Sequence, residues 1–225
     1  MLPENRARIL ERLREEDRVL DVGGWAKPFP RADAVIDLMP YETRGLYGEA
    51  DEMPERFSAE TWTQHDICAR GTWPYGDDEF DFVICSHTLE DVRDPLFVCS
   101  ELVRVARAGY VEVPSRMAEQ APGVQGPWVG WGHHFWLCDV NQDPPGIEFL
   151  FKHHILHGLP ELQVPTAAYH ASDPADRVAW FFWEGSFAFS ERTFEDPFAL
   201  NAHLAAVAEA HPPPPEAAPR RRWRR

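Results

Sequence analysis

The sequence has little of what marks a membrane or secreted protein. No stretch approaches the roughly 18 consecutive apolar residues that a membrane-spanning helix needs. Residues 1–16 are rich in charged side chains and lack the apolar core of a secretion signal. We therefore expect a cytoplasmic protein that does not associate with membranes.

Cysteine is also scarce. The four cysteines are far apart and form no Cys-x-x-Cys pair: Cys68, Cys85, Cys99 and Cys138. Cys85 lies in an apolar run and Cys99 in a helical pattern, which favours buried free thiols over disulfides or a metal site. This usage agrees with a reducing compartment.

Positive charge is the third shortage. Residues 1–219 contain 17 of the 22 basic residues and all 37 acidic ones, a net charge of −20. A protein with this excess of negative charge repels phosphate backbones, so we expect no nucleic-acid partner. The remaining arginines follow four prolines, and we interpret 212–225 as a flexible Pro/Arg-rich tail. Residues 1–211 are long enough for a single domain with a full core.

The first half alternates strand and helix patterns. Short apolar strands are expected at 18–22, 34–38, 80–86 and 110–113. Helices are expected at 3–16 and from Pro95 to Gly109, where Asp94 is the expected N-cap. This alternation predicts an α/β fold with a parallel sheet.

The second half changes character after Pro114. Apolar runs at 134–137 and 147–151 flank a turn-rich segment, and runs at 178–183 and 187–189 flank residues 184–186. Both pairs predict β-hairpins, so we expect an antiparallel, aromatic-rich second half.

Ligands of open parallel sheets bind at the carboxyl ends of the strands. A glycine pair after the first strand lets a ligand approach the backbone, and an acidic residue ending the second can hold ribose hydroxyls. Another acid further on can accept from an exocyclic amine. The residues at these ends are Gly23, Gly24, Asp37, Asp66, Ser86 and His87.

In this order and spacing, residues 18–115 resemble class I S-adenosylmethionine-dependent methyltransferases of the methyltransferase type 11 kind. The resemblance rests on Val19-Leu20-Asp21-Val22-Gly23, Asp37, His65-Asp66-Ile67, Asp78 to Val83, Ser86 to Val92, Asp94-Pro95 and Glu101 to Val105. It implies a Rossmann-like, mostly parallel sheet flanked by helices, with S-adenosylmethionine as cofactor. It also implies that Asp21, Gly23 and Gly24 shape the loop at the methionine end, that Asp37 holds the ribose, that Asp66 and Ile67 hold the adenine, and that Ser86 lines the floor.

The sequence departs from the family's pattern after the first strand. Trp25 stands where a glycine is usual, and only 15 residues separate Asp21 from Asp37. Because Pro28 and Pro30 interrupt this interval, we expect the first sheet helix to be shortened or absent. Trp25 is expected to pack on the cofactor or to close the substrate pocket.

Histidines are the remaining feature. His87, His133 and His134 are candidates for a base that removes a proton from a hydroxyl or amine acceptor. The long connection at 114–160 should form a cap over the site and bring His133 or His134 to it. A cluster of His133, His134, His153 and His157 also suggests a metal-dependent enzyme, since His153 and His157 would share a helix face. Histidines hydrogen-bonded within an aromatic second half are the third interpretation.

The expected reaction is methyl transfer from S-adenosylmethionine to a small-molecule acceptor by in-line displacement. Aromatic residues of the second half can line an acceptor pocket or pack against the sheet: Trp128, Trp131, Trp136, Trp180 and Trp183. A non-catalytic cofactor-binding protein on the same fold is the main alternative.

Overall fold

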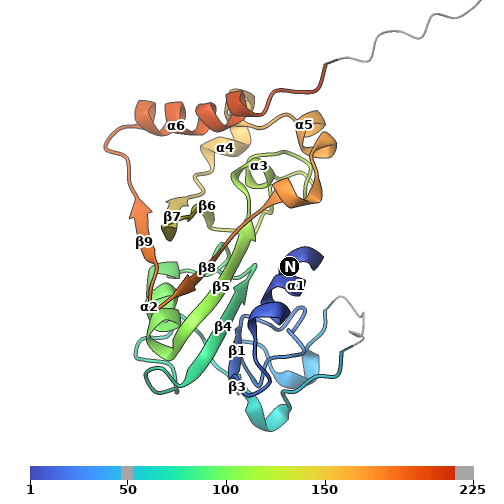
Figure 1. Ribbon diagram of the computed structural model, residues 1–225. Coiled ribbons are helices and arrows are strands. Elements are labelled where there is room, and N and C mark those ends of the chain that lie inside the picture. Colours follow the sequence, from blue (N-terminus) through green and yellow to red (C-terminus); the bar gives the residue numbers. More distant parts are fainter. Residues whose placement is uncertain (47–52, 216–225) are drawn as a thin grey trace, which may run out of the picture.

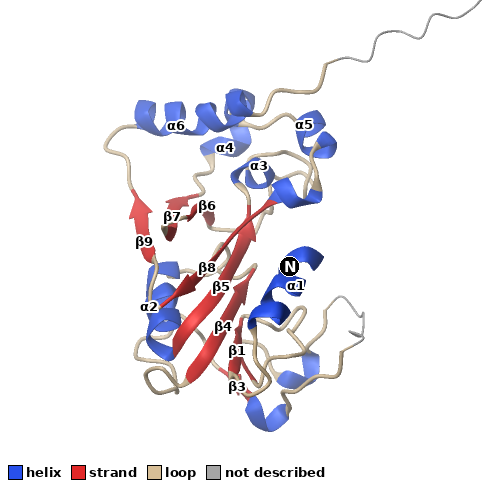
Figure 2. Cartoon of the chain, viewed as in Figure 1, coloured by secondary structure: helices blue, strands red, loops and turns tan. Residues whose placement is uncertain are grey.

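A computed structural model describes residues 1–46 and 53–215. Its main element is a six-stranded sheet in the order β3-β2-β1-β4-β5-β8 (Figures 1 and 2). The strands are β1 (Val19–Val22), β2 (Ala34–Asp37), β3 (Trp62–Gln64), β4 (Phe80–Ser86), β5 (Ala106–Pro114) and β8 (Val178–Glu184). The first five are parallel, and β8 pairs antiparallel with β5. The predicted Rossmann-like, mostly parallel α/β fold is confirmed.

The connection from β1 to β2 contains no helix in residues 23–33, as the two prolines predict. Asp33 holds this short loop against β1, because its carboxylate accepts a hydrogen bond from Val19 N at 2.9 Å. The usual helix N-terminus at this edge is therefore missing, and the loop must supply whatever contacts a ligand receives there.

Helices cover both faces of the sheet. Helix α1 (Pro3–Arg12) buries Ile9 against one face, together with Val35 and Ile84. Helix α2 (Pro95–Val105) buries Leu102 and Val105 against the other. The predicted start of α2 is confirmed, since the Asp94 carboxylate accepts from Phe97 N at 3.0 Å.

The predicted helix ends are wrong. Helix α1 stops at Arg12 rather than at residue 16, and Asp17 instead accepts a hydrogen bond from Arg14 N at 2.8 Å. Helix α2 stops at Val105, because Ala106 and Gly109 already belong to β5. Gly109 is needed there for packing rather than for a turn, since a Cβ atom would lie 2.7 Å from Trp183 Nε1.

A second sheet contains β6 (Trp136–Gln142), β7 (Pro145–Phe151) and β9 (Ala188–Arg192). The first predicted hairpin is confirmed as the antiparallel pair β6-β7. The second is wrong, because β8 completes the main sheet whereas β9 pairs parallel with β7. The aromatic side chains of Phe181 and Trp183 are buried in the core, and Gly185 (φ 69°) turns the chain away from the main sheet.

Four helices gather beyond the carboxyl end of β5 (Figure 1). Three are short, α3 (Arg116–Glu119), α4 (Ile155–Gly158) and α5 (Thr166–Ala171), and the fourth is the longer α6 (Pro197–Ala210). The described residues also form the 3₁₀ turns η1 (Tyr41–Thr43), η2 (Ala59–Thr61), η3 (Pro160–Leu162) and η4 (Pro174–Arg177). No helix in the described ranges combines the length and apolarity that crossing a membrane requires. Most of the predicted tail, 216–225, lies outside the described residues.

Candidate active site

The carboxyl ends of the parallel strands form one edge. Val22 of β1 is paired with Ile36 of β2 and with Cys85 of β4, so the loops after these strands start side by side. Ligands of open α/β sheets bind at this edge. All the residues that the sequence predicts as cofactor contacts lie on these strand ends or on the loops that follow them.

Asp37, the last residue of β2, is a nearly buried carboxylate. One oxygen accepts from Trp25 N at 3.0 Å and the other from Met39 N at 2.8 Å. Burial raises the pKa of Asp37, and these backbone hydrogen bonds oppose that rise. A carboxylate has about four lone-pair positions, so Asp37 keeps acceptor capacity for a pair of hydroxyls.

Gly23 and Gly24 are required by the packing of the protein itself. Gly23 has φ +73°, and a Cβ there would lie 2.2 Å from Thr88 Oγ1. A Cβ at Gly24 would lie 2.3 Å from Asp21 Oδ2. Glycine is therefore required at these two positions because Thr88 packs against Gly23 and Asp21 packs against Gly24.

Asp21 holds the loop after β1 in place through a backbone hydrogen bond. It is buried, and its carboxylate accepts from Phe29 N at 2.7 Å. Burial raises the pKa of Asp21 to about 7, and the nearby charge of Asp37 adds to the rise. Trp25, in the same loop, donates from Nε1 to Thr43 O at 2.7 Å, which ties its indole to η1.

Asp66 and Ile67, the residues expected at the adenine, already form hydrogen bonds within the protein. Asp66 accepts from Cys68 N at 2.9 Å and from Arg93 Nη2 at 2.7 Å. Burial raises the pKa of Asp66, but these two hydrogen bonds lower it below its ordinary value. Ile67 is buried beside them and accepts from Trp73 Nε1 through its carbonyl. Adenine would therefore share Asp66 with Arg93.

His87 follows β4 and lies between two carboxylates. Its Nε2 is 3.1 Å from Glu112 Oε1 and its Nδ1 is 3.5 Å from Glu90 Oε1, and both glutamates are buried. Burial lowers the pKa of His87, but the glutamates outweigh it and raise the pKa to about 9. His87 also has φ +54°, in the left-handed region that is strained for non-glycine residues. Ser86 lies beside it, 3.5 Å from Glu112.

The stability of the protein is expected to fall between pH 6.5 and about 9. A pKa raised from 6.5 to about 9 in the folded state contributes stability that is complete below pH 6.5 and is lost as pH rises through the folded value. Urea unfolding across this range measures the slope, and His87→Gln is the control that should flatten it. An equal slope in wild type and variant would remove His87 from the explanation.

The connection at 114–160 brings the other two predicted base candidates next to the loop after β4. Phe135 N and Trp136 N both donate to Glu90 O, at 2.8 and 3.1 Å. His134 Nδ1 hydrogen-bonds Glu119, and the His134 ring stacks on Trp131 with centroids 5.2 Å apart. Burial raises the pKa of Asp91, which the charges of His133 and His134 oppose. His133 is exposed and touches the His134 ring edge-on.

Four buried charged residues here were not predicted from the sequence: Glu90, Glu112, Glu119 and Lys152. Glu112 had a usable signal, because it is the only charged residue in the apolar run 110–113, and a buried charge needs a partner. Glu119 and Lys152 had none, since only the fold brings the two residues together.

The structure does not support the metal hypothesis. Helix α4 begins only at Ile155, so His153 and His157 do not share a helix face. His153 accepts from Ile155 N and His157 from Val129 N. Within the described ranges, no three histidine, cysteine, aspartate or glutamate side chains are arranged to hold a metal ion.

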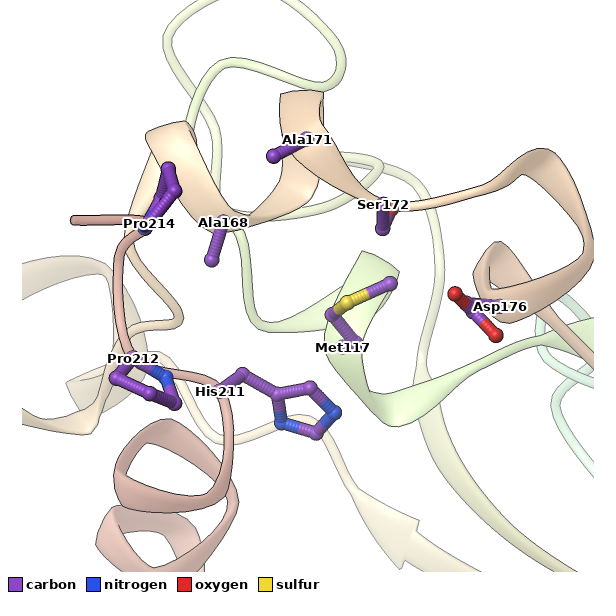
Figure 3. A pocket seen from close by; sticks show the side chains of 8 residues that line it. All are labelled: Met117, Ala168, Ala171, Ser172, Asp176, His211, Pro212 and Pro214. Carbon is purple, nitrogen blue, oxygen red and sulfur yellow. The ribbon is translucent and has the colours of Figure 1, made fainter. Parts of the chain in front are cut away.

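A cavity of about 480 Å³ lies away from these residues (Figure 3). Met117 of α3, residues of α5 and residues that follow α6 line it, and no predicted site residue contributes. Its lining includes His211 and Asp176, but it lies outside the carboxyl edge of the parallel strands, so we do not assign it to the reaction.

Comparisons with known proteins give one family match. Residues 49–111 match the family described as a methyltransferase domain. No curated protein matches the chain by sequence.

Solved structures give partial matches. One is a putative methyltransferase from Bacillus halodurans (20% identity, 53% of each chain covered, TM-score 0.36). Others are an S-adenosylmethionine-dependent methyltransferase from Mesorhizobium loti (19%, 52% of this chain and 57% of that one, 0.36) and the YcgJ protein from Bacillus subtilis (19%, 53% and 52%, 0.38). This chain spans about half the length of these proteins. Over residues 49–111, the resemblance to methyltransferases that the sequence predicts is confirmed.

Proposed function

We propose that this protein transfers a methyl group from S-adenosylmethionine to a small-molecule acceptor at the carboxyl edge of β1, β2 and β4. The observation that carries the proposal is the methyltransferase-domain match at 49–111. The match contains β3, β4 and the first part of β5, which are parallel strands of the sheet whose carboxyl edge includes Asp37. The acidic body of the protein favours a small acceptor over a nucleic acid.

The residues present fit the nucleoside part of the cofactor. Asp37 has two lone-pair positions left for the ribose hydroxyls, and Asp66 with Ile67 borders the expected adenine position. Gly23, Gly24 and Trp25 would surround the methionine part through the loop that Asp21 holds. When bound, S-adenosylmethionine supplies a methyl group on a sulfonium sulfur, which leaves with the bonding electron pair.

Among the three histidines, His134 suits the role of base best. The raised pKa of His87, about 9, keeps its imidazole protonated near neutral pH, so it cannot accept a proton. His133 is exposed, and no described carboxylate hydrogen-bonds its ring. His134 is held by Glu119 and Trp131, beside the loop after β4. The acceptor proton would pass to His134 as the acceptor attacks the methyl carbon.

S-adenosylhomocysteine, the product form of the cofactor, is expected to raise the melting temperature. A ligand that binds only the folded state stabilises it by about 2.7 kcal/mol at a concentration 100 times its Kd. Differential scanning fluorimetry with increasing ligand concentration tests this. A parallel titration with adenosine measures how much of the rise in melting temperature comes from the nucleoside part. The assignment of the cofactor fails if millimolar ligand leaves the melting temperature unchanged.

A non-catalytic cofactor-binding protein is the second candidate. The observation that favours it is the altered loop after β1, where Thr88 packs closely against Gly23 and no helix follows in residues 23–33. Binding of S-adenosylhomocysteine without methyl transfer to any acceptor of a broad screen would support this candidate over the enzyme.

A further inference from the structure

Glu119, the last residue of α3, is a carboxylate with 1% of its surface exposed. One oxygen hydrogen-bonds Nδ1 of His134, and the other accepts from Lys152 Nζ at 2.7 Å. Lys152 is also buried and donates to Trp131 O at 2.8 Å. The side chains of Lys152, Glu119 and His134, which are far apart in the sequence, thus form one buried hydrogen-bonded triad.

We infer that Glu119, held by Lys152, is the positioning residue that turns His134 into the base of the reaction. The inference rests on the function proposed above. A neutral imidazole has one N–H, and an ionised carboxylate can only accept, so the hydrogen must be on Nδ1. Nε2 then carries the free lone pair that can take a proton.

The surroundings of Glu119 hold its side chain in place. Lys152 supplies the opposite charge that a buried carboxylate needs. Burial lowers the pKa of Lys152, and Glu119 opposes this shift. Gly130 has φ +61°, and a Cβ there would lie 2.6 Å from the Glu119 carboxylate, so the loop closes tightly over it.

The ring of His134 is held in one plane, and its Nε2 is left without a hydrogen bond from the described residues. Trp131 stacks on it with an interplanar angle of 19°. No described residue hydrogen-bonds Nε2, and the side chain is 7% exposed. The next residues, Phe135 and Trp136, bind Glu90 O through their N–H groups, which places His134 at the edge where the cofactor is proposed.

This position gives Glu119 a defined part in the proton transfer. The acceptor X–H bond breaks, its proton goes to Nε2, and its electron pair forms the bond to the methyl carbon. The methyl–sulfur electron pair stays on sulfur. The imidazolium that results lies against the Glu119 carboxylate, which stabilises its charge as it forms.

The test uses the full chain with Glu119→Gln and Lys152→Met combined. Removing both charges leaves no buried ion unpaired, so the double variant should fold. Asp139→Asn is the matched control, because it removes a carboxylate from the Arg116 pair in the same region without touching His134. Far-UV circular dichroism and the melting temperature check all three proteins.

The first readout is ¹⁵N NMR of the imidazole of His134 in the ligand-free protein. Wild type and Asp139→Asn should show the Nδ1–H tautomer alone, and the double variant a mixture. A mixture in wild type, or one unchanged tautomer in the double variant, would overturn the positioning role. This readout is independent of whether any acceptor is methylated.

The second readout is turnover with S-adenosylmethionine and an acceptor found by screening. The double variant should lose at least about 100-fold in kcat, with its affinity for S-adenosylhomocysteine unchanged. Full turnover in a folded double variant would overturn the inference. If wild type binds no S-adenosylhomocysteine, the proposed function fails, and the NMR result still decides whether Glu119 orients His134.

Discussion

Replacing His134 with alanine is expected to reduce the turnover of methyl transfer by roughly 10²–10⁴-fold, because a positioned base contributes about that factor. The fold should persist, since Glu119 keeps its ion pair with Lys152 when the imidazole is removed. The affinity for S-adenosylhomocysteine should not change, because no predicted cofactor contact involves this ring. Radiolabelled methyl transfer to a screened acceptor measures the effect, and calorimetry measures the affinity.

His133→Ala is the matched control for this result. It removes a neighbouring imidazole that is exposed and that no described carboxylate hydrogen-bonds, so turnover should change little. Equal losses in both variants would indicate a disturbed loop rather than a lost base. Full activity in His134→Ala would mean that the acceptor needs no base or uses another one.

Replacing Asp37 with alanine is expected to weaken binding of S-adenosylhomocysteine at least tenfold. Hydrogen bonds to a charged group contribute roughly 1.5–3 kcal/mol, and a factor of ten requires only about 1.4 kcal/mol. Titration calorimetry gives the Kd directly.

Two further variants separate binding from folding. Asp37→Asn keeps a carbonyl oxygen for one of the two N–H groups, from Trp25 and Met39, that the carboxylate accepts. Asp77→Ala removes a charge from an exposed pair with Arg104, away from the carboxyl edge, and should bind as wild type does. Unchanged affinity in a folded Asp37 variant would mean that this carboxylate does not hold the ribose.

Much of the first half could be predicted because its local patterns agree with the fold. Continuous apolar runs predicted β1, β2 and β4 almost to the residue, since strands covered on both faces carry no polar alternation. The Asp94-Pro95 pair predicted the start of α2, because capping depends on neighbouring residues alone. Pro28 and Pro30 likewise predicted the missing helix.

The second half was harder because its pairing is decided over long distances. Residues 178–192 have the pattern of a hairpin, yet β8 finds its partner in β5, some 70 residues earlier in the chain, and β9 finds its partner in β7. The edge of β5 offers a buried place for the aromatic side chains of β8, which outweighs the local turn. Helix α6 was missed, and in the structure its Leu204 closes a small core with Leu156 and Leu162.

In the candidate site, the positions of several residues could be predicted, but the roles of the histidines could not. Asp37, Asp66, Ser86 and His87 were predicted from their places after strands, and the structure puts them on one edge. The roles of the histidines could not be separated from the sequence, because they depend on which carboxylates face each ring. Glu112 and Glu90 come to His87, and Glu119 to His134, only in the folded protein.

A crystal structure of the protein with bound S-adenosylhomocysteine would show whether the carboxyl edge of the sheet is the cofactor site. We expect electron density for the ligand along the carboxyl edge of β1, β2 and β4, with both ribose hydroxyls on Asp37. We also expect the sulfur to face the side from which His134 can reach an acceptor. Density for the ligand elsewhere, or a ribose away from Asp37, would rule out this site.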